Sequence, residues 1–174
     1  DNACQITGNE TVSNSNAPSI DAVVSVSPLC HAGTDGIITV TASGGTGTLS
    51  YSSDNGANFQ TSNEFTDLTA GVYSVIVKDD KACQTSASET LVAPTIIAFT
   101  SVATDETCGS TDGTIIITAN GGTGTLSYSS DNGSNFQSSN EFTGLAAATY
   151  SLIVKDDNAC QITGNETVSN SNAP

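Results

Sequence analysis

The sequence contains no Trp, no Met and no Arg, and aromatic residues make up only 5% of it. Its basic residues are Lys78, Lys81 and Lys155, against 18 Asp and Glu, which gives a net charge of −15. Neutralising phosphates requires clustered cations, so the composition excludes nucleic acid as a partner and also excludes attraction to anionic lipid. No apolar run approaches the length of a bilayer span, so we expect no direct membrane insertion.

Residues suited to common catalytic chemistry are scarce as well. His31 is the single histidine, which leaves no Ser-His-Asp arrangement, and no activated nucleophile is evident. The glycine-rich stretch Gly44–Gly47 lacks the Lys and the following helix of a phosphate-binding loop, so we interpret it as a strand-end bend. The sequence therefore predicts a protein that is not an enzyme and has no catalytic residues.

The sequence is rich in repetition. Asp1–Pro18 recurs letter for letter as Asp157–Pro174, and Gly44–Gly56 recurs unchanged as Gly121–Gly133. Similarity at a fixed period is the signature of a tandem array. We interpret the chain as part of such an array, with 1–18 as the terminal strand of a preceding module, 19–94 as the first module and 95–174 as the second.

Alternation of apolar and polar residues with a period of two predicts strands and no helix. The repeated Asn55-Gly56 and Asn132-Gly133 steps suit tight turns that need positive φ. Six or seven short antiparallel strands per module predict an all-β chain of immunoglobulin-like β-sandwich modules. Because no flexible linker follows Pro94, we expect the modules to be joined end to end in an extended rod. The clearest predicted strands are Ile20–Val26, Gly36–Ser43, Val72–Lys78 and Ile96–Val102.

The five cysteines predict disulfides, because they show no CxxC spacing of the kind that binds zinc. We favour pairing within each module, Cys30 with Cys83 and Cys108 with Cys160, and Cys4 would then pair outside this segment. Each bond would close a loop of about fifty residues, worth about 4 kcal/mol in the chain-entropy model. The alternative pairs Cys4 with Cys30 and Cys83 with Cys108, and the sequence leaves this open. Both alternatives imply an oxidising compartment outside the cytosol.

A series of short motifs runs from Cys30 to Cys83 and again, with small changes, from Cys108 to Cys160. The most specific elements are Ser-Gly-Gly-Thr-Gly, Leu-x-x-Gly-x-Tyr and a terminal Asp-x-x-x-Cys, although Ala148 replaces the Gly of the second element in the second module. The series resembles the SprB repeat, found in tandem in very large cell-surface adhesins of gliding Bacteroidota, and is distantly similar to polycystin-type immunoglobulin-like domains. The resemblance implies an extracellular filament, exported by the type IX secretion system, that acts in surface adhesion and gliding motility.

On this interpretation the protein is located outside the cell, at the bacterial surface. Its partners are neighbouring modules of the same chain, and surface polysaccharide or other cell-surface proteins are further candidates. Two alternatives stay open: a multivalent array in which each module binds glycan or Ca²⁺, and a set of accessory modules of a large secreted enzyme. Tyr51 and Tyr128 are the aromatic candidates for glycan contact, but they suit core positions better.

We expect no cofactor, with Ca²⁺ as the one exception to consider. Carboxylates are the hard oxygen ligands that Ca²⁺ prefers, and they recur in the strand-end loops of both modules. Solvated turn carboxylates are the favoured interpretation, because no EF-hand spacing is present. The candidates are Asp35, Asp79, Asp80, Asp112, Asp156 and Asp157.

Overall fold

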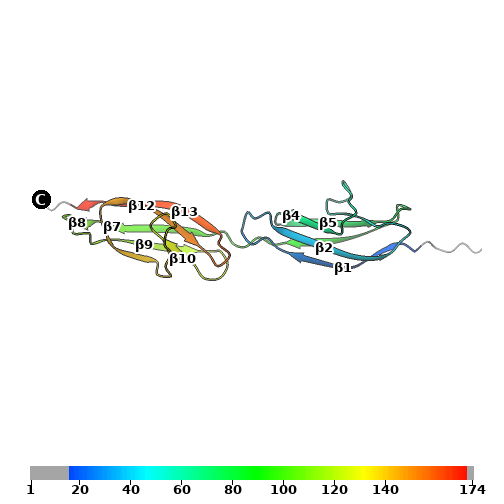
Figure 1. Cartoon of the computed structure of the whole chain (residues 1–174), viewed down its shortest axis with the longest axis horizontal. Coiled ribbons are helices and arrows are strands. Elements are labelled where there is room, and N and C mark those ends of the chain that lie inside the picture. Colours follow the sequence, from blue (N-terminus) through cyan, green and yellow to red (C-terminus); the bar gives the residue numbers. More distant parts are fainter. Residues whose placement is uncertain (1–15, 172–174) are drawn as a thin grey trace, which may run out of the picture. The chain divides into compact units, whose positions relative to one another are not determined.

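The computed structural model describes residues 16–171, and every regular element in that range is a strand (Figure 1). The prediction of an all-β chain is therefore confirmed. Within the same range there is no helix with the length and hydrophobicity needed to cross a membrane. Cys4 and most of the predicted terminal strand lie outside the described residues.

The described chain divides into two compact units. The first contains the described residues up to Ser25, Ile38–Phe65 and Val72–Thr90, and the second contains Val26–Ile37, Thr66–Gly71 and Leu91 onward. The loop that follows the first strand, with Cys30 in it, therefore belongs to the second unit. The module boundary at Pro94 stays a prediction.

Six strands make two sheets of three in the first half of the chain. One sheet has the order β1-β2-β4 and the other the order β3-β5-β6. The pairing of β3 with β5 is antiparallel. The bounds are β1 (Pro18–Val26), β2 (Gly36–Gly44), β3 (Ser50–Ser52), β4 (Glu64–Leu68), β5 (Gly71–Lys78) and β6 (Gln84–Leu91).

The second half repeats this arrangement, with sheets of order β11-β9-β7 and β10-β12-β13. Neighbouring strands in both of these sheets are antiparallel. A short parallel pair, β8 with β14, is added beside them and has no counterpart among the predicted strands. The bounds are β7 (Ala98–Thr104), β8 (Glu106–Thr107), β9 (Gly113–Asn120), β10 (Ser127–Ser129), β11 (Glu141–Leu145), β12 (Ala148–Lys155), β13 (Gln161–Val168) and β14 (Asn170–Ser171).

The two sheets of the second unit share one core, which makes the unit a β-sandwich. Ile115 and Ile117 of β9 are fully buried, and so are Leu152 and Val154 of β12 in the opposite sheet. Alternate residues of a strand point to opposite faces, so the alternation of apolar and polar residues along these strands accounts for the burial of these side chains. The Tyr150 hydroxyl donates a hydrogen bond to the Ala146 carbonyl, 3.0 Å away, as in the tyrosine corner of immunoglobulin-like sandwiches.

Candidate functional site

The turn after β12, from Asp156 to Cys160, is organised around a buried carboxylate. Asp156 is 4% exposed, and its carboxylate accepts hydrogen bonds from the backbone amides of Asn158 and Cys160, each at 2.9 Å. A third amide, that of Thr123, donates to it at 2.8 Å from the loop after β9. The carboxylate thus fixes the turn and also attaches it to the end of a strand in the opposite sheet.

The same turn follows β5 in the first half of the chain. The Asp79 carboxylate accepts hydrogen bonds from the amides of Cys83 at 2.8 Å and of Lys81 at 2.9 Å. The amide of Thr46 donates to it at 2.9 Å. Burial raises the pKa of the Asp79 carboxyl, but these three amides and the positive charge of Lys81 together lower it more, so the pKa lies below its ordinary value.

The glycine-rich loops after β2 and β9 present backbone amides to these carboxylates. Gly44, Gly45 and Gly47 have φ of 73°, 75° and 80°, and from this loop the amide of Thr46 donates to Asp79. The amide of Thr48 donates to the next carboxylate, Asp80, at 3.0 Å. Successive amides in such a conformation form an anion-binding concavity. The predicted bend is thus also an anion cradle, and its anion is the chain's own aspartate pair.

The signal for this pairing was present in the sequence. The glycine-rich block and the Asp-Asp step recur together, and each Thr–Asp hydrogen bond spans 33 residues in both halves of the chain. We missed it because the glycine block and the acidic step were each considered alone. The pairing supplies a physical reason for two of the specific motif elements, the glycine block and the terminal Asp-x-x-x-Cys.

The calcium candidates all accept hydrogen bonds from backbone amides. Asp35 accepts from Leu29, and Asp112 accepts from the Thr107 amide at 2.7 Å. Within residues 16–171, no group of three or more His, Cys, Asp or Glu side chains is placed to bind a metal ion. Binding of Ca²⁺ itself stays a prediction. The other four candidates, Asp79, Asp80, Asp156 and Asp157, line the two glycine loops.

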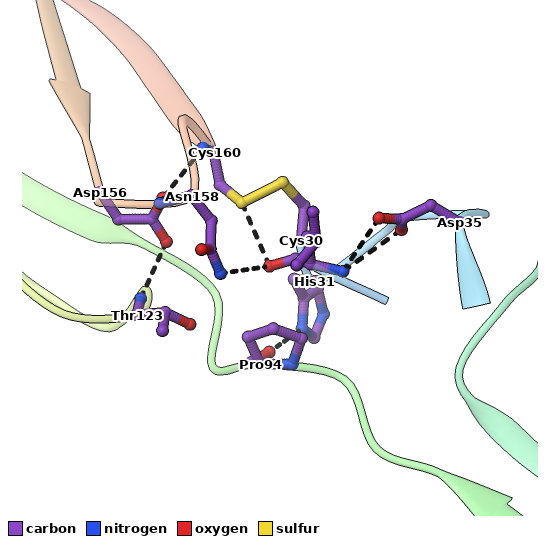
Figure 2. Close-up of a disulfide and its surroundings, with 9 residues drawn as sticks. Cys30, His31, Asp35, Pro94, Thr123, Asp156, Asn158 and Cys160 are labelled. Atoms are coloured by element: carbon purple, nitrogen blue, oxygen red, sulfur yellow. Dashed lines mark hydrogen bonds between the residues drawn. A yellow bond between two sulfur atoms is a disulfide. The ribbon is translucent and has the colours of Figure 1, made fainter. Parts of the chain in front are cut away.

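The disulfide differs from both predicted pairings. Cys30 is bonded to Cys160, 130 residues later, with their Cα atoms 5.5 Å apart (Figure 2). Pairing of Cys30 with Cys83 and of Cys108 with Cys160 is therefore wrong, and so is the alternative that gives Cys30 to Cys4. Cys108 is exposed and is not in a disulfide.

The strand directions explain why pairing within a module fails. Cys108 lies just before β9 begins, whereas the Cys160 turn is bonded through Thr123 to the loop where β9 ends. Eight residues of strand separate these ends by about 26 Å, and a disulfide requires Cα atoms within about 7 Å. A disulfide between Cys108 and Cys160 would have brought Asp112 close to Asp156, and it is excluded for the same reason.

Polar contacts accompany the disulfide on both sides (Figure 2). The Leu29 carbonyl accepts a hydrogen bond from Asn158 Nδ2 at 3.3 Å, beside the bonded Cys160. His31 Nδ1 lies 2.9 Å from the Pro94 carbonyl, to which it donates. The loop that carries Cys30 is itself closed by the Asp35 carboxylate, which accepts from the Leu29 amide. The loop that carries Cys30 and the turn that carries Cys160 are thus each held by their own hydrogen bonds where the disulfide joins them.

A second repeated turn follows β3 and β10. The Asp54 carboxylate accepts hydrogen bonds from the Ser52 hydroxyl at 2.6 Å and from both the amide and the side chain of Asn58. These bonds lower the pKa of Asp54 to about 2, with the Ser52 hydroxyl contributing most. Asn55 and Gly56 have φ of 60° and 84°, which confirms the predicted tight turn. Asp131 is bonded in the same way, and its pKa is also lowered to about 2, mainly by the Asn135 amide.

Some of these features lie within a segment that matches a known family. Residues 22–58 match the family described as the SprB repeat. The match covers 37 of the 174 residues of the chain. The matched segment includes the Cys30 loop, β2, the first glycine loop and the Asp54 turn. No curated protein matches the chain.

Solved structures of other proteins resemble the chain at low identity. The fibronectin(III)-like modules of Clostridium thermocellum CbhA are 16% identical, with a TM-score of 0.35, over 88% of this chain and 94% of that one. The insect immune protein hemolin is 13% identical, with a TM-score of 0.42, over 93% of this chain and 49% of hemolin. Murine CEACAM1b is 11% identical, with a TM-score of 0.36, over 86% of this chain and 98% of that one. The second unit is a β-sandwich by its own strand pairing and shared core.

The glycine cradle can be tested by Gly124→Ala. A Cβ at this position would overlap the Asp157 carboxylate, and the residue has a φ of 75°. We expect a loss of about 1–2 kcal/mol for the unfavourable φ and about 1 kcal/mol or more for displacing the carboxylate, measured by urea denaturation. Gly109→Ala is the matched control, because Gly109 has a φ of 73° and nothing within 4 Å of an added Cβ. Equal losses in the two variants would contradict the cradle.

The Asp54 turn predicts a specific acid dependence. The folded pKa of about 2 is below the ordinary value of 3.8, so ionised Asp54 stabilises the fold above the ordinary pKa and loses this effect as pH falls through the folded pKa. The stability difference between the wild type and Asp54→Asn should therefore shrink as pH falls from about 5 to about 2. Urea midpoints at several pH values measure this stability difference. The contributions of the other carboxylates cancel because both proteins contain them. A difference that does not change with pH would show that Asp54 is not perturbed.

Proposed function

We propose that the chain is a stalk segment of a large bacterial cell-surface adhesin, an extracellular filament built from tandem modules. The observation that carries the proposal is the disulfide between Cys30 and Cys160, combined with the SprB repeat at residues 22–58. Disulfides of this kind persist in oxidising surroundings outside the cytosol. The same strand arrangement recurs along the chain, which supports a role in extending a filament rather than in catalysis.

The disulfide suits a filament that bears tension. When the two ends of the chain are pulled apart, the load passes from Cys30 directly to Cys160 through the sulfur–sulfur bond. The residues between them therefore carry no main-chain tension while the bond is intact. In a stalk, this arrangement limits the length by which the chain can extend even when its sandwiches unfold.

Composition supports the same role. A net charge of −15 makes neighbouring copies repel one another, which keeps a long filament soluble and separate. We further propose, from the family resemblance, that the parent protein is exported by the type IX secretion system and acts in adhesion and gliding motility. Its partners outside the chain would be surface polysaccharide or other cell-surface proteins, bound by parts of the parent that this chain does not contain.

Surface location can be tested on intact cells that produce the parent protein. Antibodies raised against residues 16–171 should label these cells without permeabilisation, and proteinase added outside should remove the label. Cells from which the parent gene has been deleted are the control for antibody specificity. Labelling that requires permeabilisation would contradict an extracellular stalk.

Load transfer through the disulfide can be tested by single-molecule force spectroscopy with handles at both ends. Reduction should release the chain between the two cysteines, which are 130 positions apart, and add about 430–470 Å to the extension of the fully stretched chain. The double variant Cys30→Ser, Cys160→Ser should show the longer extension in oxidising and reducing buffers alike. An oxidised wild-type chain that already reaches the longer extension would contradict the load path.

A further inference from the structure

Two turns of the chain end in the same reactive dipeptide. The segments Gly44–Gly56 and Gly121–Gly133 are identical in sequence, and each ends in an Asn-Gly step. The amide nitrogen that follows an asparagine can attack the carboxamide of that asparagine, and glycine hinders this attack least because it has no side chain. Asn55 and Asn132 are both exposed. A difference in their reactivity in the folded chain would therefore come from the surroundings of the two turns.

The attacking nitrogen is held in the same way in both turns. The Gly56 amide donates a hydrogen bond to the Ser52 hydroxyl at 2.9 Å, and the Gly133 amide donates to the Ser129 hydroxyl at 2.9 Å. Both serines are fully buried. This hydrogen bond must break before the nitrogen can attack, so it slows the reaction in both turns and does not distinguish them.

The two carboxamides, in contrast, are held differently. The Ser74 hydroxyl of β5 donates a hydrogen bond to Asn55 Oδ1 at 3.1 Å. The corresponding hydroxyl in β12, that of Ser151, donates instead to Asn165 Oδ1 at 3.2 Å. Among residues 16–171 the Asn132 side chain has no hydrogen-bond partner, and it lines a polar hollow of about 350 Å³ together with Ser151 and Asn165. The Asn132 carboxamide is therefore free to rotate toward the glycine amide, whereas that of Asn55 must first leave Ser74.

A third Asn-Gly step, at Asn120 and Gly121, is fixed by strand pairing. Asn120 is the last residue of β9 and pairs with Ala98 of β7. A Cβ added to Gly121 would overlap the Ile96 carbonyl, which shows how closely the two backbones approach. The Gly121 nitrogen cannot turn toward the asparagine carboxamide without separating these strands. We therefore expect this step to react more slowly than Asn132.

We propose that Asn132 is a site of spontaneous deamidation, a modification that the chain performs on itself with water as the co-reactant. The Gly133 nitrogen forms a bond to Cγ of Asn132 while the bond from Cγ to Nδ2 breaks. Ammonia leaves and carries away the proton of the Gly133 amide. Water then opens the cyclic imide at one of its two carbonyls, which yields aspartate or isoaspartate. The reaction requires no tandem array, so it is independent of the proposed function.

Either product changes the turn. The new carboxylate directly follows Asp131, whose own carboxylate accepts hydrogen bonds from Ser129 and Asn135 and has its pKa lowered to about 2. Two carboxylates so close together repel each other. Isoaspartate also lengthens the main chain by one carbon within the turn. A long-lived chain would thus accumulate damage in the turn after β10 while the matching turn after β3 stays intact.

The test follows both turns in the full chain during incubation at mildly alkaline pH, which favours loss of the amide proton. Peptide mapping by mass spectrometry measures each rate. The one additional hydrogen bond at Asn55 corresponds to a factor of about five, so Asn132 should deamidate about five times faster than Asn55. Asn120 should also be slower than Asn132. Equal rates at Asn55 and Asn132 in the folded chain, or a faster rate at Asn55 or Asn120, would overturn the proposal.

The unfolded chain provides the reference for these rates. In urea with a reducing agent, the rates at Asn55 and Asn132 should converge, because the hydrogen bonds of the fold are absent. This measurement also corrects for Ala57 and Ser134, the residues that follow the two turns. A fivefold difference that persists in urea would come from the local sequence and would overturn the assignment to the fold.

Two matched variants test the part played by the serine hydroxyl. Ser74→Ala removes the bond to the Asn55 carboxamide and should raise the rate at Asn55 about fivefold, to that of Asn132. Ser151→Ala is the control, because its hydroxyl is bonded to Asn165, and it should leave the rate at Asn132 unchanged. The rate of each variant in urea separates loss of the bond from loss of the fold. An unchanged rate at Asn55 in folded Ser74→Ala would show that Ser74 does not protect it.

Discussion

The structure depends on an aspartate carboxylate buried at the end of a sandwich and bound by backbone amides. Asp156 accepts amides from its own turn and from the glycine loop after β9, and so connects strands of opposite sheets. A carboxylate that is buried without such partners is costly, but several amides aimed at it offset the loss of water. Asp79 does the same in the first half of the chain. The cysteine of each turn is therefore positioned by an aspartate.

This constraint also explains the disulfide connectivity. The loop after β9 and the turn after β12 lie at one end of their sandwich because Thr123 and Asp156 are bonded there, so β9 and β12 run in the same direction. The cysteine before β9 is then at the far end and cannot reach the cysteine after β12. A cysteine from another loop, Cys30, bonds to that turn instead.

Much of the fold could be predicted from the sequence, because alternation reports which face of a strand is buried. Ile38 and Val40 in the predicted strand Gly36–Ser43 are fully buried, and so is Val75 in the predicted strand Val72–Lys78. The Asn-Gly turns have the predicted positive φ. Local periodicity does not report whether two strands in opposite sheets run in the same direction. The relative direction of the strands decides which cysteines come close enough to form a disulfide. The bonds between glycine loops and aspartates were missed for a related reason, since they join segments that are distant in sequence.

The long span of the Cys30–Cys160 bond also bears on damage to the main chain. A proteinase that cuts once at any peptide bond between these residues leaves two pieces that remain one covalent molecule. Exposed turns such as Asp54–Asn58 and Asp131–Asn135 lie inside this span, and turns of this kind are where nicking concentrates. The chain can therefore be nicked in its most accessible turns without being severed.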